Sequence, residues 1–229
     1  MTLRLRLGLA PILAAAFAAC SPHVEGNGVY AERVFDAGQV APFDRAAIGL
    51  PPDVDGEPLK ASIFANDQPR QVVLSGDENI IQHIEVKVDG GGTLRTSTDL
   101  GSYTAVHPPQ LRVQAPELVA VEAIGGAAVT VLGAAAPTFT ATASAKGHVS
   151  LSGAGGTTLL ADLSGGAVLD ASGYPVTSAQ LVLTGASRAT VWSAGQVTGS
   201  ATEASAILVK GVAPCEVVLT GGSTCEPLP

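Results

Sequence analysis

Two short acidic runs are the first candidates for chemistry in this 229-residue chain. Asp53, Asp55 and Glu57 alternate with other residues in one run, and the second run is Asp77–Asn79. Carboxylate and amide oxygens are the ligands that Ca²⁺ prefers. Solvated turns are the commoner reason for such runs, so we predict turns here and keep a weak cation site as the alternative. No metal or other cofactor is expected.

Enzymatic chemistry has little support in the sequence. The segment Gly153–Thr158 superficially resembles a phosphate-binding loop, but it lacks the lysine that contacts the phosphates, and no helix follows it. The acidic residues of the C-terminal half are not placed in a matched register, as a pair of catalytic carboxylates would need; they are Asp162, Asp170, Glu203, Glu216 and Glu226. We therefore predict a protein that is not an enzyme, with a carbohydrate-active lyase or hydrolase as the alternative.

The first residues have the composition of a secretory signal. Arg4 and Arg6 give a positive start, and the apolar stretch Leu7–Ala18 is shorter than the roughly 20 residues that span a membrane. The segment ends in Phe17–Cys20, which resembles the lipobox of bacterial lipoproteins, where small residues precede a cysteine that becomes lipidated.

We predict that Cys20 is the lipidation site and that residues 1–20 are a lipoprotein signal peptide. An ordinary cleaved signal peptide is the alternative. Ser21, rather than Asp, follows the cysteine, and enterobacterial sorting rules would then favour the outer membrane. The predicted location is the bacterial cell envelope, with the membrane as a partner through the lipid anchor.

The remaining cysteines, Cys215 and Cys225, form a candidate disulfide once Cys20 is assigned to the anchor. An oxidising compartment favours such a pair. Neither cysteine has a Cys or His at the spacing of a zinc site. We predict a disulfide that staples the C-terminal end, with two free thiols as the alternative.

Composition divides the rest of the chain. Residues 21–33 combine Pro and Gly with polar residues and are predicted to be a tether, so the folded domain is expected over residues 34–229.

Without Arg4 and Arg6 the chain has ten basic and twenty acidic side chains. This balance argues against nucleic-acid partners, which need clustered Lys or Arg.

The C-terminal half repeats with a period near 20 residues. Short apolar strands end at Gly133, Gly153, Gly173, Gly195 and Gly211, in steps of 20, 20, 22 and 16 residues. A second series of strands lies between them, and two short strands for each repeat are typical of one turn of a β-solenoid. We predict that Val149 and Leu151 face its interior.

The region before the repeats also consists of strands. In residues 83–88, Ile84, Val86 and Val88 alternate with polar residues, which predicts a half-buried strand. The segment Val73–Ile81, followed by Ile84–Val88 and Gly92–Leu94, is similar to the opening of the putative auto-transporter adhesin, head GIN domain family, and Leu151–Gly155 resembles the Ser-Gly-Ala-Gly steps of that family. The resemblance implies an all-β fold, a single-stranded right-handed parallel β-helix (β-solenoid), in a bacterial envelope protein. It supplies no catalytic residues.

The predicted protein is a tethered β-helix of about nine or ten coils with short coils of about 20 residues. At about 4.8 Å for each coil, it would be roughly 45 Å long. We predict a non-enzymatic envelope lipoprotein with an adhesive or structural surface. A cell-surface glycan or an envelope protein is the expected partner, and a periplasmic scaffold that binds another envelope protein is a further alternative.

Overall fold

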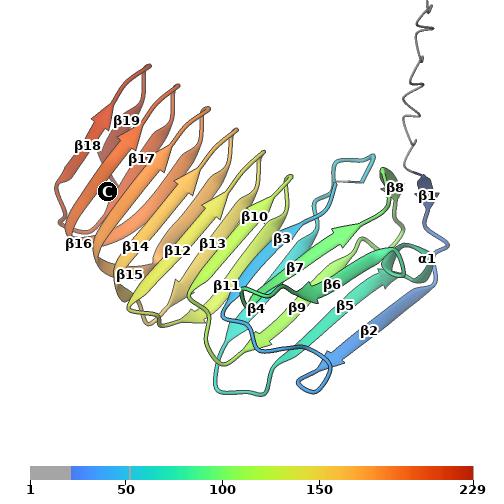
Figure 1. The fold of residues 1–229 in the computed structure, drawn as a ribbon. Coiled ribbons are helices and arrows are strands. Elements are labelled where there is room, and N and C mark those ends of the chain that lie inside the picture. Colours follow the sequence, from blue (N-terminus) through green and yellow to red (C-terminus); the bar gives the residue numbers. More distant parts are fainter. Residues whose placement is uncertain (1–21, 52, 229) are drawn as a thin grey trace, which may run out of the picture.

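The computed structural model describes residues 22–51 and 53–228, and the fold is almost entirely β. Cys20 and the predicted signal peptide lie outside the described residues. In Figure 1 the C-terminal coils stack at one end of the molecule and the N-terminal strands form the other. No helix in the described part of the chain is long and apolar enough to cross a membrane.

Two sheets face each other along the molecule, and β15 and β16 turn the corner between them, so that each contributes to both. Sheet I contains, in order, β2 (Tyr30–Asp36), β5 (Gln71–Asp77), β9 (Gln110–Ala115), β4 (Lys60–Ala65), β11 (Ala128–Ala134), β13 (His148–Gly153), the first halves of β15 (Val168–Leu183) and β16 (Arg188–Ala201), β17 (Ala206–Lys210) and β19 (Thr224–Pro227). Sheet II contains β6 (Ile84–Val88), β7 (Thr93–Thr98), β3 (Arg45–Gly49), β10 (Ala120–Ile124), β12 (Thr138–Ala143), β14 (Gly156–Leu163), the second halves of β15 and β16, and β18 (Cys215–Leu219).

The C-terminal half is the β-solenoid that the repeat predicts, with about five turns of parallel strands. Val129 lies beside Val149 and Val149 beside Leu169, so equivalent positions recur every 20 residues. These columns of inward side chains form the core between the sheets. Val149 and Leu151 are 0% and 1% exposed, which confirms that they face the interior.

The turns from sheet II to sheet I stack on one another and hold two successive residues at positive φ. Gly165–Gly166, Gly185–Ala186 and Glu203–Ala204 all adopt this conformation. Backbone hydrogen bonds connect each of these turns to the next. Gly166 N donates to Gly185 O at 2.7 Å, and Ala186 N donates to Glu203 O at 2.8 Å. Left-handed geometry costs a non-glycine residue about 1–2 kcal/mol, which these bonds between turns help to offset.

The expectation of nine or ten coils is wrong, because the N-terminal half is not coiled throughout. There β5 runs antiparallel to both β2 and β9, and β6 runs antiparallel to β7. The turn Asp89–Gly92 explains the second pair: Asp89 Oδ1 accepts hydrogen bonds from Gly91 N and Thr93 N, and Gly92 has a φ of 73°. This tight turn returns the chain beside β6 instead of carrying it across to the opposite sheet.

The segment expected to be a tether is also part of the folded body. The short strand β1 (His23–Glu25) pairs with β8 (Ser102–Thr104), and β2 begins at Tyr30. The polar composition misled the prediction, since this segment is held by backbone pairing to distant strands, with Val24 and Ala31 half-buried against the core. The folded body therefore includes β1 and the start of β2, within the segment predicted to be a tether.

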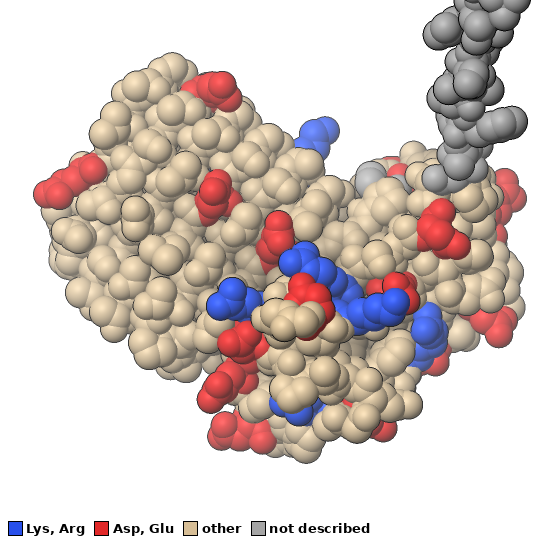
Figure 2. Space-filling model, viewed as in Figure 1, with Lys and Arg blue, Asp and Glu red and all other residues tan. Residues whose placement is uncertain are grey.

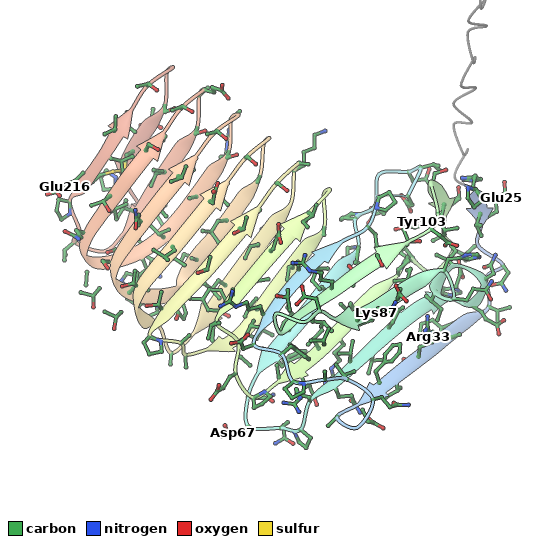
Figure 3. All side chains as sticks on the ribbon, viewed as in Figure 1. Glu25, Arg33, Asp67, Lys87, Tyr103 and Glu216 are labelled. Atoms are coloured by element: carbon green, nitrogen blue, oxygen red, sulfur yellow. A yellow bond between two sulfur atoms is a disulfide. The ribbon has the colours of Figure 1, made fainter. Side chains whose placement is uncertain are left out.

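The N-terminal end of the sandwich is closed by side-chain and backbone contacts. The single-turn helix α1 (Glu78–Ile81) lies there and buries Ile80 and Ile81. Arg33 on β2 donates from Nη1 to Ile81 O at 2.8 Å and to Ile84 O at 2.9 Å, so it links the outermost strands of the two sheets (Figure 3).

Candidate functional site

The outer surface of the solenoid is built from mostly uncharged side chains, many of them short, with Leu132, Val182 and Trp192 as larger exposed ones. On sheet II, Thr138, Thr140 and Thr142 of β12 alternate with buried neighbours, and Thr138 lies beside Thr158 on the next coil. Figure 2 shows few charges over these coils, whereas Lys, Arg, Asp and Glu gather over the N-terminal half. The fold thus presents a regular surface on which hydroxyl-bearing side chains recur from coil to coil.

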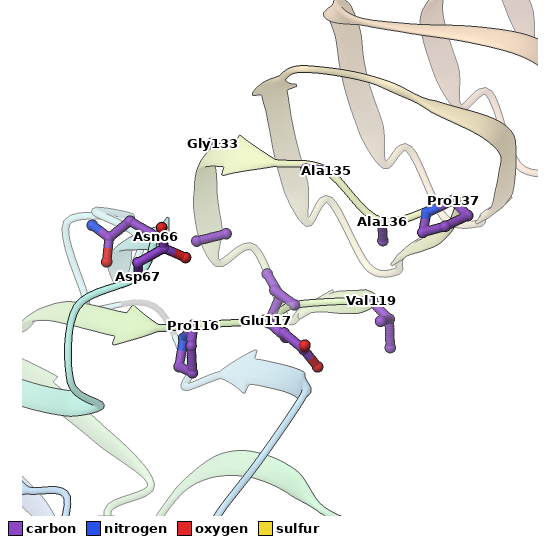
Figure 4. A pocket seen from close by; sticks show the side chains of 11 residues that line it. Asn66, Asp67, Pro116, Glu117, Val119, Gly133, Ala135, Ala136 and Pro137 are labelled. Carbon is purple, nitrogen blue, oxygen red and sulfur yellow. The ribbon is translucent and has the colours of Figure 1, made fainter.

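A depression of about 510 Å³ lies where the N-terminal strands meet the solenoid (Figure 4). Asn66, Asp67 and Glu117 line it together with small and apolar residues. The two carboxylates come from separate segments, both are exposed, and neither forms an ion pair with a described residue. This arrangement does not resemble the acid and base pair of a glycoside hydrolase, whose carboxylates face each other across the bond that is cleaved.

The structure does not bring the acidic runs together as a cation site. Asp53 is 5% exposed, and its Oδ1 accepts a hydrogen bond from Glu57 N at 2.7 Å, which closes a turn. Burial, with a smaller effect from the charge of Asp53, raises the pKa of Tyr103 to about 12. Within residues 22–51 and 53–228, no group of three or more His, Cys, Asp or Glu side chains is placed to hold a metal ion.

Asp77 is fully buried and binds its own chain. Its Oδ2 accepts hydrogen bonds from Val106 N at 2.7 Å and His107 N at 3.2 Å, and its Oδ1 lies 2.9 Å from His107 Nδ1. Burial alone would raise the pKa of Asp77, but the hydrogen bonds from His107 and Val106 outweigh it and hold the pKa below its ordinary value.

The neighbouring Asn79 has a similar structural task. Its Oδ1 accepts a hydrogen bond from Asn27 N at 2.9 Å, and its Nδ2 donates to Glu25 O at 2.7 Å. The run Asp77–Asn79 therefore ties the N-terminal strand and the segment after β8 to the end of β5. Sequence reasoning identified the run as polar but could not show that its partners lie 29 to 54 residues away.

Cys215 and Cys225 form a disulfide, with their Cα atoms 6.5 Å apart. Cys215 follows Val197 in one inward column, and Cys225 follows Ile207 in the opposite one. The bridge joins β18 of sheet II to β19 of sheet I and staples the C-terminal end, as the sequence predicts. Cys215 is exposed and Cys225 half-buried, because no further described coil covers this end.

Comparison with protein families identifies the family to which the chain belongs. Residues 59–213 match the model of the family described as "Putative auto-transporter adhesin, head GIN domain". The chain belongs to this head GIN domain family. The match spans most of the two-sheet body and includes the strands on which the resemblance in the sequence rests. A comparison with curated proteins finds no match.

Solved structures show the same head GIN fold at low sequence identity. A putative adhesin from Bacteroides fragilis has a TM-score of 0.67 and 14% identity, covering 89% of this chain and 99% of that one. A putative adhesin from Parabacteroides merdae has a TM-score of 0.55 and 13% identity, covering 90% and 99%. A putative lipid binding protein from Parabacteroides distasonis has a TM-score of 0.55 and 14% identity, covering 91% and 100%.

The buried carboxylate gives this head GIN domain a testable acid sensitivity. Because the pKa of Asp77 is lower in the folded state than its ordinary value of 3.8, its ionised form stabilises the fold above that value, and this contribution is lost as the pH falls through the folded-state pKa. We expect Asp77→Asn to lower the free energy of unfolding by about 2 kcal/mol at pH 7. The variant should also lose less stability than the wild type between pH 7 and pH 3, as measured by urea unfolding.

The exposed Asp67 supplies the matched control, since Asp67→Asn removes the same charge at a position where the carboxylate forms no ion pair with a described residue. Equal acid dependence of Asp77→Asn and the wild type would contradict the assignment.

Proposed function

We propose that this protein is a non-enzymatic, lipid-anchored protein of the bacterial cell envelope whose two-sheet body serves as an adhesive or structural surface. Membership in the head GIN domain family supports an adhesive role. The observation that carries the proposal is the outer surface of the solenoid, where hydroxyl and small side chains repeat on a rigid frame with few charges (Figure 2).

The N-terminal geometry is compatible with an anchor on Cys20. Pro22 O accepts a hydrogen bond from Gly101 N at 3.0 Å, so the described body begins two residues after the predicted lipidation site. A lipid at Cys20 would therefore hold the N-terminal strands near the membrane. The last coil, where Glu216 is labelled in Figure 3, lies at the opposite end of the molecule.

A periplasmic scaffold is the second candidate, because the same far end exposes apolar side chains. Val212, Val218 and Leu219 are 86%, 66% and 41% exposed. Such a patch would suit a protein partner better than a soluble glycan. The two candidates share the lipid anchor and differ in what they bind.

Metabolic labelling tests the anchor. Palmitate label should enter the wild-type protein, and Cys20→Ala should lose it and shift from the membrane fraction to the soluble fraction, because the acyl chains supply the membrane affinity. Cys215→Ser together with Cys225→Ser is the matched control and should retain the label. An acylated, membrane-bound Cys20→Ala protein would show that the lipobox assignment is wrong.

Binding screens test the surface role. Full-length protein in detergent would be presented to glycan and cell-wall arrays beside a panel of glycoside hydrolase and lyase substrates. Retention of a glycan or cell-wall fraction without turnover supports the proposal. Cleavage of any substrate would overturn its non-enzymatic part.

A further inference from the structure

The outer surface of sheet I is hollowed where β2, β5, β9 and β4 lie side by side (Figure 1). The hollow has a volume of about 590 Å³. We call it the Arg112 groove; it is lined chiefly by Tyr30, Glu32, Lys60, Phe64, Gln110 and Arg112. The four strands that it crosses span about 14 Å, at about 4.8 Å between neighbours, which is long enough for a stretch of polymer rather than one small molecule.

Arg112 lies in the middle of this groove, and its guanidinium has no carboxylate partner among the described residues. Strand pairing places it between Ser62 on β4 and Val73 on β5. Its Cζ lies 5.2 Å from the centre of the Phe64 ring, and it forms no ion pair with a described residue. By contrast, Arg95 is paired with Asp89 at 2.7 Å. A stacked guanidinium keeps its planar fork of donors available for a carboxylate.

A second cation and several neutral polar groups surround Arg112. Lys60 lies beside Gln110, and Gln110 lies beside Ser75 on the next strand. Lys60 contacts Glu57 at 3.4 Å, but both side chains are more than half exposed, so this ion pair contributes little to stability. The anion of a ligand can therefore replace Glu57 as the partner of Lys60. Amides and hydroxyls at these positions can both donate and accept hydrogen bonds, as the hydroxyl groups of a sugar require.

Aromatic side chains are placed at two opposite corners of the groove. Phe64 lies on β4 beneath Arg112, and Tyr30 lies on β2 at the far side, where its hydroxyl donates to Glu32 at 2.6 Å. Flat aromatic rings offer apolar surface at a polar site and can pack against the C–H face of a sugar. The groove is thus cationic toward β4 and β9 and acidic toward β2.

We propose that the Arg112 groove binds a segment of an acidic, carboxylate-bearing polysaccharide. The ligand carboxylate would lie between Arg112 and Lys60, and its sugar rings would extend over Phe64 and toward Tyr30. This assignment rests on the proposed adhesive function and names the ligand class for it. Charge complementarity selects the ligand, because Lys60 and Arg112 both line the groove, whereas its acidic lining residue Glu32 lies on β2, away from the proposed position of the ligand carboxylate. Two cations are too few for adhesion to an anionic lipid surface, which needs a larger basic cluster.

Calorimetry with full-length protein in detergent tests the proposal. The probes are oligogalacturonate, the same oligomer methyl-esterified, galacturonic acid monomer and inorganic phosphate. We expect oligogalacturonate to bind best, esterification to weaken it by about 10-fold or more, and added salt to weaken it further. Arg112→Gln should lower the affinity by about 10-fold, and Arg112→Lys should lower it less, because it keeps the charge but loses the planar fork.

Arg188→Gln is the matched control, because Arg188 is exposed on β16 of the same sheet but lies beside Val168 and Ala206, outside the groove. It should bind like the wild type, and circular dichroism should show all variants folded. Equal binding of the esterified oligomer, tighter binding of phosphate, or unchanged binding by Arg112→Gln would overturn the groove assignment.

The test also separates this inference from the function on which it rests. Adhesion of cells to a neutral glycan that is unchanged by Arg112→Gln would overturn the acidic ligand and leave the adhesive role standing. Cells that lack the protein but adhere to every surface as the parent strain does would overturn the adhesive role itself.

Discussion

Leu151→Asp should abolish cooperative folding of the solenoid. Leu151 is 1% exposed and lies beside Val131 of the preceding coil, inside the two-sheet core. Removal of a buried leucine side chain costs about 2–5 kcal/mol, and burial of an unpaired carboxylate adds several more. Since a domain is stable by only about 5–15 kcal/mol, the sum is comparable to the whole stability of the fold.

The effect should extend beyond one coil, because each coil of a solenoid buries its core against its neighbours. Thermal unfolding followed by circular dichroism should show loss of the main transition or a large fall in its midpoint. Thr130→Asp is the matched control: Thr130 lies on the outer face between Ser62 and Ser150, so an added carboxylate there stays hydrated. An unchanged melting curve for Leu151→Asp would refute the register of β13.

The solenoid was predictable from sequence because its physics is local and repeated. Glycine-punctuated strands near 20-residue intervals can bury their apolar faces in one way, by stacking, and the alternation at Val149 and Leu151 indicates which face is inside. The alternation of β6 likewise predicted a half-buried strand. What it could not predict was the partner strand, because antiparallel and parallel neighbours use the same alternation.

The N-terminal half was less predictable because its contacts join distant segments. The residues of β1 and the start of β2 are polar enough to suggest a tether, and their order comes from pairing with β8 and β5. Phe64 and Arg112 are 48 residues apart in sequence, and only the pairing of β4 with β9 brings them together. No motif signals the Arg112 groove, since it arises from the register of four strands.

Removal of the disulfide by the double change Cys215→Ser, Cys225→Ser should fray the last coil and leave the earlier coils folded. The bridge joins β18 to β19 across the coil interior, at positions that continue the columns of Val197 and Ile207. For its sequence separation of 10, loop entropy gives a contribution of about 2–3 kcal/mol. Without the bridge, two small polar side chains face each other where the core ends, and little else holds this coil, since most residues of β18 and β19 are exposed.

Hydrogen exchange should locate the loss, because amides of β18 and β19 should lose protection while those of β12 and β14 keep it. Sedimentation should show more self-association, since fraying exposes the next strand edges and apolar side chains such as Val209, which is 3% exposed in the intact fold. Wild-type protein with the disulfide reduced is the matched control and should behave like the double variant. Two free thiols in protein purified from the envelope, or unchanged protection of β18 and β19 in the double variant, would show that the bridge does not hold the end of the solenoid.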